Sequence, residues 1–477
     1  MKYNSRFKFN PLATYGIIVA GSLAIVFSLR FIRLELFIGP SFDTAYYLQA
    51  LWRLSQFELP ITNFTEIYQG STTNLIFANH FQYSILFYIP LFWLSNSPLF
   101  VGEFLIPFIT LVLTLYWWHQ LFPDRDSLLW GVLGFILLLW SPYSGIFSDE
   151  FYFDMFSVPW VLASLFFLRE KREIPFLISL FIVVGFKLYF ASFAALACFL
   201  YYAENRSKKA VWAGLLFIVY FLFILIVAIP YFFNSESALK EYVGVMDIEG
   251  SFAWLAYLFE RSFNWESLGY LLKIIGTFLF IPIISPRLAF LALPILGINC
   301  LFFAGEIPGS HYDSLPNTIF SVAFVYGILD INRHIKILHS RLVGFFTFVI
   351  VLVIVYSSLN NTLYRLREDF FSLRSQPAYI SEIRDALSKI QPEEEISIVP
   401  KLTPYVLKNS GWVFPKPFNQ KNLGNKVKRV IIAKHHQSYL NPFGGNTQEF
   451  YKYIEFLKEE YNMNVEVESV SLVVLTK

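Results

Sequence analysis

The strongest constraint on this chain is a series of long apolar runs that recur through its first 358 residues. Runs of about 18 residues or more are typical of helices that cross a bilayer. Only 15% of the residues are charged, whereas a soluble globular domain carries about 25%. The sequence therefore predicts a polytopic membrane protein and excludes a coiled coil, a disordered chain and an ordinary cytosolic enzyme. The net charge of +2 provides no basic field for binding nucleic acid.

The charged residues are unevenly spread along the chain. They make up 12% of residues 1–358 and 24% of residues 359–477. Because the second value is that of a soluble protein, we place a domain boundary near Ser358. The patterns beyond it predict strands at 396–399 and 430–433, a strand or hairpin at 465–475, and amphipathic helices at 381–390 and 448–461. The sequence thus predicts an all-α membrane domain followed by a small α/β domain.

Basic residues indicate how the apolar segments cross the membrane, since they prefer the cytoplasmic side. They cluster at 2–8, 125, 169–172, 206–209, 287 and 333–341. Residues 81–94 form a short apolar stretch that is broken by Pro90. If this stretch lies in the outer interface, or enters the membrane and returns to the same side, every basic cluster falls on the cytoplasmic side. About eleven transmembrane helices follow, at 12–30, 98–118, 127–144, 155–168, 174–186, 190–203, 209–231, 268–285, 287–304, 314–330 and 341–358. This topology places the N-terminus in the cytoplasm and the C-terminal domain outside a plasma or inner membrane.

Two long outer segments, 31–97 and 232–267, follow from this topology. Residues 43–57 of the first loop have the apolar spacing of a helix that lies on the membrane surface. Residues 174–203 must cross twice, although each half has only about 13 residues and a bilayer core needs about 20. Lys187 stands at the break between the halves.

Ionisable side chains in or beside apolar helices are costly, at ~2.5–3.5 kcal/mol for a charge at mid-helix, and so indicate function. On the predicted outer side they are Asp43, His80, Glu103, Asp149, Glu150, Asp154, Lys187, Lys273, His311 and Asp313. Plainer interpretations stay open for several of them. Asp43 could cap a helix, and Lys273 could extend its ammonium to the interface. Lys187 is not explained in that way and is a candidate for binding an anion.

The acids Asp149, Glu150 and Asp154 lie within six residues at a helix entrance. They could form a solvated helix start, or they could hold a divalent cation such as Mg or Mn together with substrate phosphates. His80 and the run His311-Tyr312-Asp313 are candidates for hydrogen bonding or acid–base chemistry, although a lone interfacial histidine usually does neither.

Together, these outer residues fit a reaction between a lipid-linked anionic donor and an acceptor outside the membrane. A carboxylate in the first outer loop would accept a proton from the acceptor hydroxyl. The cations at membrane depth would hold the lipid phosphate and stabilise charge on the leaving group.

Several short motifs resemble a family of predicted membrane proteins known as domain of unknown function 2079. The residues that carry the resemblance are Phe42-Asp43, Gln49-Ala50-Leu51-Trp52, His80-Phe81, Pro90-Leu91, Asp154 with Val158-Pro159, Lys187, Ile229-Pro230-Tyr231-Phe232, His311-Tyr312 with Pro316, and Ile398-Val399-Pro400. That family is in turn similar to the GT-C superfamily of integral-membrane glycosyltransferases.

The resemblance implies a GT-C-like fold and a transferase that takes its sugar from a polyprenyl-phosphate lipid. It implies Asp43 as the catalytic base and Asp149–Asp154 as a second acidic site. Taken with the outer set of ionisable residues, we also predict His80 as a catalytic residue, and Lys187, Lys273, His311 and Tyr312 as the residues that bind the donor phosphate. The expected partners are the donor lipid, the surrounding membrane lipids and a glycan, lipid or protein acceptor. Two departures bear on activity: Leu188 stands where the family usually has an acid, and Tyr152 where it tends to have a histidine.

Two other functions compete with this prediction. A transporter or flippase of lipid-linked glycans predicts charged residues along a path through both leaflets, whereas the unusual charges here are confined to the predicted outer side. A catalytically inactive GT-C-like scaffold predicts that Asp43, His80, Lys187 and His311 lie far apart in the folded chain.

Overall fold

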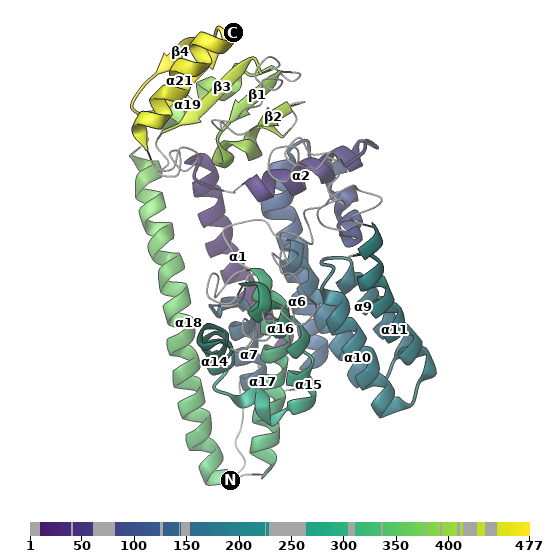
Figure 1. Cartoon of the computed structure of the whole chain (residues 1–477). Coiled ribbons are helices and arrows are strands. Elements are labelled where there is room, and N and C mark those ends of the chain that lie inside the picture. The colour runs from purple at the N-terminus through teal and green to yellow at the C-terminus, as the bar shows by residue number, and fades with distance from the viewer. Residues whose placement is uncertain are drawn as a thin grey trace.

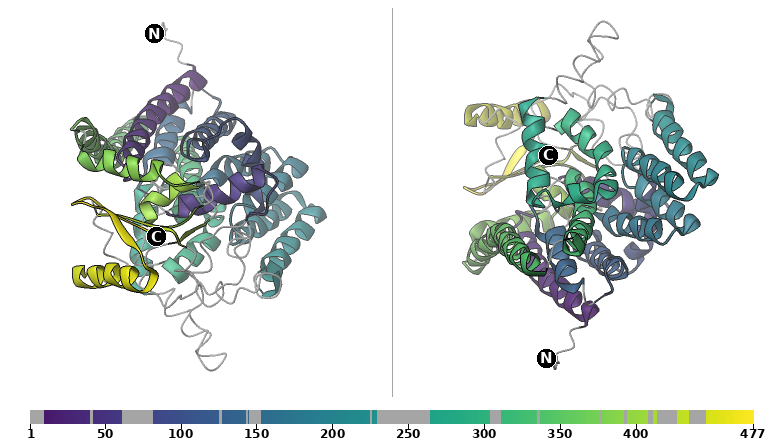
Figure 2. Two further views of the ribbon diagram at one scale, coloured as in Figure 1. Left: turned by 90° about the horizontal axis from the view of Figure 1, so that it is seen from above. Right: turned by 90° about the horizontal axis from the view of Figure 1, so that it is seen from below.

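The computed structural model of the chain describes residues 10–39, 42–60, 82–124, 127–142, 144, 153–224, 226–228, 264–303, 311–334, 337–375, 377–391, 394–407, 411–413, 427–434 and 446–477. They form a helical bundle with a small sheet-containing domain at one end (Figure 1). Helices α1 and α18 lie on one flank of the bundle and α9, α10 and α11 on the other, as the views along the bundle also show (Figure 2).

The described part of the bundle consists of α-helices joined by short 3-10 and π-helical elements. They are α1 (Pro11–Glu35), α2 (Phe42–Ser55), the 3-10 helix η1 (Tyr83–Trp93), α5 (Pro98–Phe100), the π-helix η2 (Val101–Leu105), α6 (Ile106–Leu121), α7 (Leu128–Trp140), η3 (Phe153–Ser157), α8 (Val158–Arg169), α9 (Glu173–Val184), α10 (Phe190–Asn205), α11 (Lys208–Phe223), α14 (Trp265–Thr277), η5 (Ile281–Ile284), α15 (Pro286–Phe290), α16 (Leu293–Phe303), η6 (His311–Asp313), α17 (Ser314–His334) and α18 (Ile337–Arg374).

Five helical segments of the described chain are long and apolar enough to cross a bilayer. They are Pro11–Glu35, Pro98–Leu121, Lys208–Ala228, Ser314–Ile331 and Thr347–Arg374. Helices α7, α8 and α9 match predicted spans but have only 13, 12 and 12 residues, which is short for a core about 30 Å thick. The fold is mostly helical, as predicted, while the expected number of eleven crossings stays a prediction.

The predicted spans 268–285 and 287–304 are each interrupted in the structure. Helix α14 ends at Thr277, and Leu279 and Phe280 then adopt left-handed backbone angles, with φ of 56° and 58°. Proline follows at position 282 within η5 and at 286, the first residue of α15. Because proline lacks the backbone N–H that a helix interior needs, four shorter elements replace two continuous helices.

Residues 81–94 behave as the sequence predicts for a segment that does not span. The 3-10 helix η1 has 11 residues with Pro90 inside it, so it is too short to cross a bilayer core. Its start is fixed to the end of α9, because the Ser84 hydroxyl donates a 2.7 Å hydrogen bond to the carbonyl of Ile182. Its end is fixed to α2, because the Trp93 indole donates to the carbonyl of Ser55 at 2.8 Å.

Helix α2 lies across the end of the bundle, between the transmembrane helices and the sheet (Figure 1). It packs closely on the π-helix η2 at Gly102. A Cβ at this position would lie 2.4 Å from Cδ2 of Leu48, and Leu48 is fully buried. Only glycine lets the side chain of Leu48 approach the η2 backbone this closely.

We therefore expect Gly102→Ala to lower the free energy of unfolding by about 1–3 kcal/mol, the usual cost of overpacking. Gly16→Ala in α1 is the control, because a Cβ there would meet nothing within 4 Å and alanine favours a helix by roughly 0.5–1 kcal/mol over glycine. The measurement is unfolding of the purified protein in mixed micelles. Equal stability of the two variants would show that α2 can move away from η2 at little cost.

The C-terminal domain contains a five-stranded sheet in the order β2-β1-β3-β5-β4. Its elements are α19 (Ala378–Ser388), β1 (Glu395–Ile398), the 3-10 helix η7 (Pro400–Val406), β2 (Gly411–Val413), β3 (Arg429–Ala433), α21 (Thr447–Tyr461), β4 (Asn464–Glu468) and β5 (Leu472–Thr476). Strand β1 pairs in parallel with β2 and β3, and β5 pairs antiparallel with β3 and β4. The predicted strands, the hairpin at 465–475 and both helices are confirmed, within a few residues at their ends.

Helix α18 joins the bundle to this domain. It runs without a break for 38 residues, which is about 57 Å at 1.5 Å per residue and nearly twice the thickness of a bilayer core. The predicted boundary near Ser358 therefore lies inside a continuous helix, ahead of the charged part of that helix, which starts at Arg365. The separate C-terminal elements start at Ala378.

Candidate functional site

The turn between α9 and α10 places Lys187 in the protein interior. Its Nζ donates a 2.9 Å hydrogen bond to Oδ2 of Asp154, and their side chains are only 9% and 2% exposed. Asp154 belongs to η3, which leads into α8. Two ionisable residues that the sequence marks as costly thus form one buried ion pair.

Two aromatic rings complete the surroundings of Lys187. Its Nζ lies 4.6 Å from the ring centre of Tyr312 and 5.6 Å from that of Tyr189, which is within the range of a cation–π contact. An ammonium has three N–H donors, and Asp154 accepts the one hydrogen bond that Lys187 makes within the described residues. The remaining donors are available to another acceptor, and a phosphate oxygen has the right chemistry.

A second polar cluster adjoins the first through Tyr312 and Asp313. The side-chain Nδ2 of Asn299 in α16 donates to the carbonyl of Tyr312 and to Oδ1 of Asp313, both at 3.2 Å. The hydroxyl of Tyr270 in α14 donates to the same Asp313 oxygen. Three segments, α14, α16 and η6, are therefore held together by buried hydrogen bonds next to the ring that covers Lys187.

The sequence prediction included Asp313 but missed Tyr270 and Asn299. Neither is ionised, and each lies within an apolar helix, so a search for charges could not find them. The available signal was the spacing of α14, in which Ser267, Tyr270 and Ile274 form one buried face.

The structure describes several of the other predicted site residues only in part or not at all. Asp43 lies in the first turn of α2, but its side chain, like that of His311, lies outside the described part of the chain. The same holds for the whole of residues 80, 149, 150 and 152. Lys273 is described, and its side chain is exposed. The predicted cation site at Asp149–Asp154 stays a prediction, since the described residues include no cluster of three metal-ligating side chains and two of its three acids lie outside them.

A second buried ion pair lies nearer to the C-terminal domain. Nη1 of Arg30, at the end of α1, is 3.2 Å from Oε2 of Glu103 and donates to the Glu103 carbonyl at 2.9 Å. Glu103 belongs to the π-helix η2. In a π-helix the backbone hydrogen bonds join residues five apart, and such turns are frequent at functional sites. The sequence marks Glu103 as a costly charge, whereas Arg30, near the end of an apolar run, looks like an ordinary interfacial residue.

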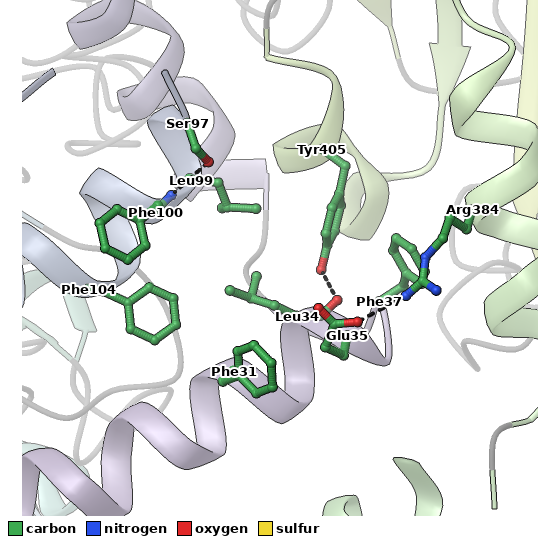
Figure 3. Close-up of a pocket in the computed structure, with 10 residues that line it drawn as sticks. All are labelled: Phe31, Leu34, Glu35, Phe37, Ser97, Leu99, Phe100, Phe104, Arg384 and Tyr405. Atoms are coloured by element: carbon green, nitrogen blue, oxygen red, sulfur yellow. Dashed lines mark hydrogen bonds and ion pairs between the residues drawn. The ribbon is translucent and has the colours of Figure 1, made fainter. Parts of the chain in front are cut away.

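Beside this pair, a cavity of about 350 Å³ opens between α1, the segment 97–104 and the C-terminal domain. Figure 3 shows how its polar groups pair: the Tyr405 hydroxyl donates to the Leu34 carbonyl at 2.8 Å, and Nη2 of Arg384 is 2.9 Å from Oε2 of Glu35. The remaining wall is mostly apolar, formed by Phe31, Phe37, Leu99, Phe100 and Phe104 together with Ser97.

Comparison with protein families identifies the chain. Residues 33–451 match the family described as "Predicted membrane protein (DUF2079)". The protein is a member of this family. The match extends from the end of α1 to the start of α21, so it includes the Lys187–Asp154 pair and most of the C-terminal domain, but not Arg30 or the strands β4 and β5. A search of curated proteins finds no match.

This DUF2079 protein is similar in fold to solved structures of one membrane protein. ArnT from Cupriavidus metallidurans bound to undecaprenyl phosphate is similar with a TM-score of 0.53 and 11% identity, over 96% of this chain and 97% of that one. The apo form of the same protein gives a TM-score of 0.48 at 11% identity, over 97% of each chain. At this identity the likeness concerns the fold, and that fold extends over nearly the whole of both chains.

Proposed function

We propose that this DUF2079 protein is an integral-membrane glycosyltransferase of the GT-C type. It transfers a sugar from a polyprenyl-phosphate donor to an acceptor at the outer face of the membrane. The observation that carries the proposal is Lys187, a buried cation that is anchored by one acid, flanked by two aromatic rings and still has N–H donors to offer. The likeness in fold to a protein that binds undecaprenyl phosphate supports a polyprenyl phosphate as the matching ligand.

The roles of the residues follow from their chemistry. Lys187 binds the donor phosphate and stabilises the negative charge that grows on it as the sugar leaves. Asp154 holds the ammonium in place, and the ring of Tyr312 screens it from water. Asp43, at the start of the helix that covers the bundle, accepts the proton of the acceptor hydroxyl as this oxygen attacks the sugar.

Binding of the lipid phosphate is the first test. We expect undecaprenyl phosphate to bind to the purified protein roughly tenfold or more tightly than undecaprenol, because a hydrogen bond to a charged group contributes about 1.5–3 kcal/mol. The two lipids share the same tail, so their difference isolates the phosphate. Equal affinities would contradict a phosphate site at Lys187.

A further inference from the structure

The C-terminal domain meets the membrane domain at the corner between α1 and α2. The 3-10 helix η7 (Pro400–Val406) packs directly on α2. The side-chain Nε2 of Gln49, in the middle of α2, donates a 3.3 Å hydrogen bond to the carbonyl of Leu407, just beyond η7. Both residues are buried, with exposed fractions of 0% and 3%. An amide side chain at this depth contributes little to a core except through its hydrogen bonds.

Tyr405 of η7 completes the end of α1. Its hydroxyl donates to the carbonyl of Leu34 at 2.8 Å. This carbonyl also accepts a hydrogen bond from the backbone N–H of Phe37 at 3.1 Å, so the tyrosine adds a second partner at the end of the helix. Burial raises the pKa of the Tyr405 phenol above its ordinary value, so it remains a donor at physiological pH. Figure 3 shows the hydroxyl directed at this carbonyl from the C-terminal domain.

The chain turns sharply at Phe37, just beyond the end of α1. Phe37 has φ of 56°, in the left-handed region that residues other than glycine usually avoid. The ring of Tyr405 lies against the ring of Phe37, with a centroid distance of 4.9 Å. The same tyrosine therefore contacts the end of α1 with its hydroxyl and supports the strained corner with its ring.

We propose that Tyr405 and Gln49 are positioning residues, through which the C-terminal domain holds α2 and thereby fixes Asp43 relative to the bound donor. The proposal rests on the proposed function, because only a catalytic role for Asp43 makes the placement of α2 matter for a rate. In this account the C-terminal domain is part of the catalytic assembly, although its described residues supply no group to the Lys187 site.

Hydrogen–deuterium exchange of the full-length protein in nanodiscs tests the contact itself. Tyr405→Phe keeps the ring against Phe37 and removes only the hydroxyl, while Gln49→Met keeps the bulk of the side chain and removes the amide. We expect the amides of α2 to exchange roughly fivefold faster in each variant, the effect of losing about 1 kcal/mol of hydrogen bonding. Those of α10 should not change. Tyr451→Phe, on the exposed face of α21, is the matched control and should leave α2 unaffected.

The kinetics test the positioning role. We expect kcat for sugar transfer to fall roughly tenfold to a hundredfold in the double variant, as for a misplaced catalytic group, with the donor KM unchanged because Lys187 is untouched. Unchanged exchange in α2 would overturn the proposal whatever the activity. Faster exchange with unchanged kcat would overturn it as well. Failure of the proposed function would appear separately, as the absence of transfer by the wild-type protein, and the exchange data do not depend on it.

Discussion

Lys187→Met is expected to lower the free energy of unfolding by about 3–5 kcal/mol, because it removes the ammonium that offsets the cost of burying the Asp154 carboxylate. Methionine retains most of the length of lysine, so the lost packing is small. Asp154 is fully enclosed, with its side chain 2% exposed, and solvent cannot replace the ammonium. Unfolding of the purified protein in mixed micelles provides the measurement.

Two further variants separate the charge from other effects of the substitution. Lys187→Met combined with Asp154→Asn should recover much of the lost stability, since a neutral pair in a buried site is often as stable as an ionic one. Lys273→Met, at an exposed lysine, should change stability by no more than about 0.5 kcal/mol. If the double variant is stable but has lost its preference for undecaprenyl phosphate over undecaprenol, Lys187 acts on the ligand. A preserved preference would assign the ion pair to the fold alone.

Asp43→Asn is expected to lower kcat by roughly 10²–10⁴-fold, the usual contribution of a general base. Asparagine has nearly the same shape, and it also serves as well as aspartate at the start of a helix. The helix should therefore persist, and the KM for the lipid donor should stay close to that of the wild type, because the proposed function assigns binding of the donor to Lys187.

This substitution also tests the plainer interpretation of Asp43, a residue that only stabilises the first turn of α2. In that case transfer by Asp43→Asn would continue at the wild-type rate. Single-turnover measurements with excess protein provide the comparison, because they report the chemical step without product release. Asp43→Ala is a useful companion, as it should lose both the base and any stabilisation of the turn.

The C-terminal domain was the part of the fold best predicted from sequence. Short apolar runs such as 430–433, bounded by charged residues and loops, have few alternatives to a buried strand, and the amphipathic helix at 448–461 has a strong period. The membrane domain was predicted less completely. In an almost uniformly apolar stretch such as 268–304, hydropathy does not show where a helix stops, and only the prolines and the turn at Phe280 do so.

The sequence predicted several residues of the candidate site but not which of them contact one another. The cost of burying charge marked Asp154 and Lys187, yet their pairing depends on how η3 and the α9–α10 turn meet across 33 positions of sequence. Tyr270 and Asn299 carry no charge and were missed. Arg30 was missed for another reason, since its partner Glu103 lies on a different helix and a single arginine near a helix end is ordinary at a membrane interface.

In the proposed function, this DUF2079 protein cleaves the bond between a sugar and a polyprenyl phosphate. The most direct measurement is the release of undecaprenyl phosphate, followed by mass spectrometry, when wild-type protein in proteoliposomes is given undecaprenyl-phosphate-linked hexoses and pentoses with mixed membrane glycans as acceptors. We predict release from at least one donor by the wild type and a loss of that release in Asp43→Asn. Equal release by the two proteins, or binding of the donors without release of the lipid phosphate from any of them, would contradict the account.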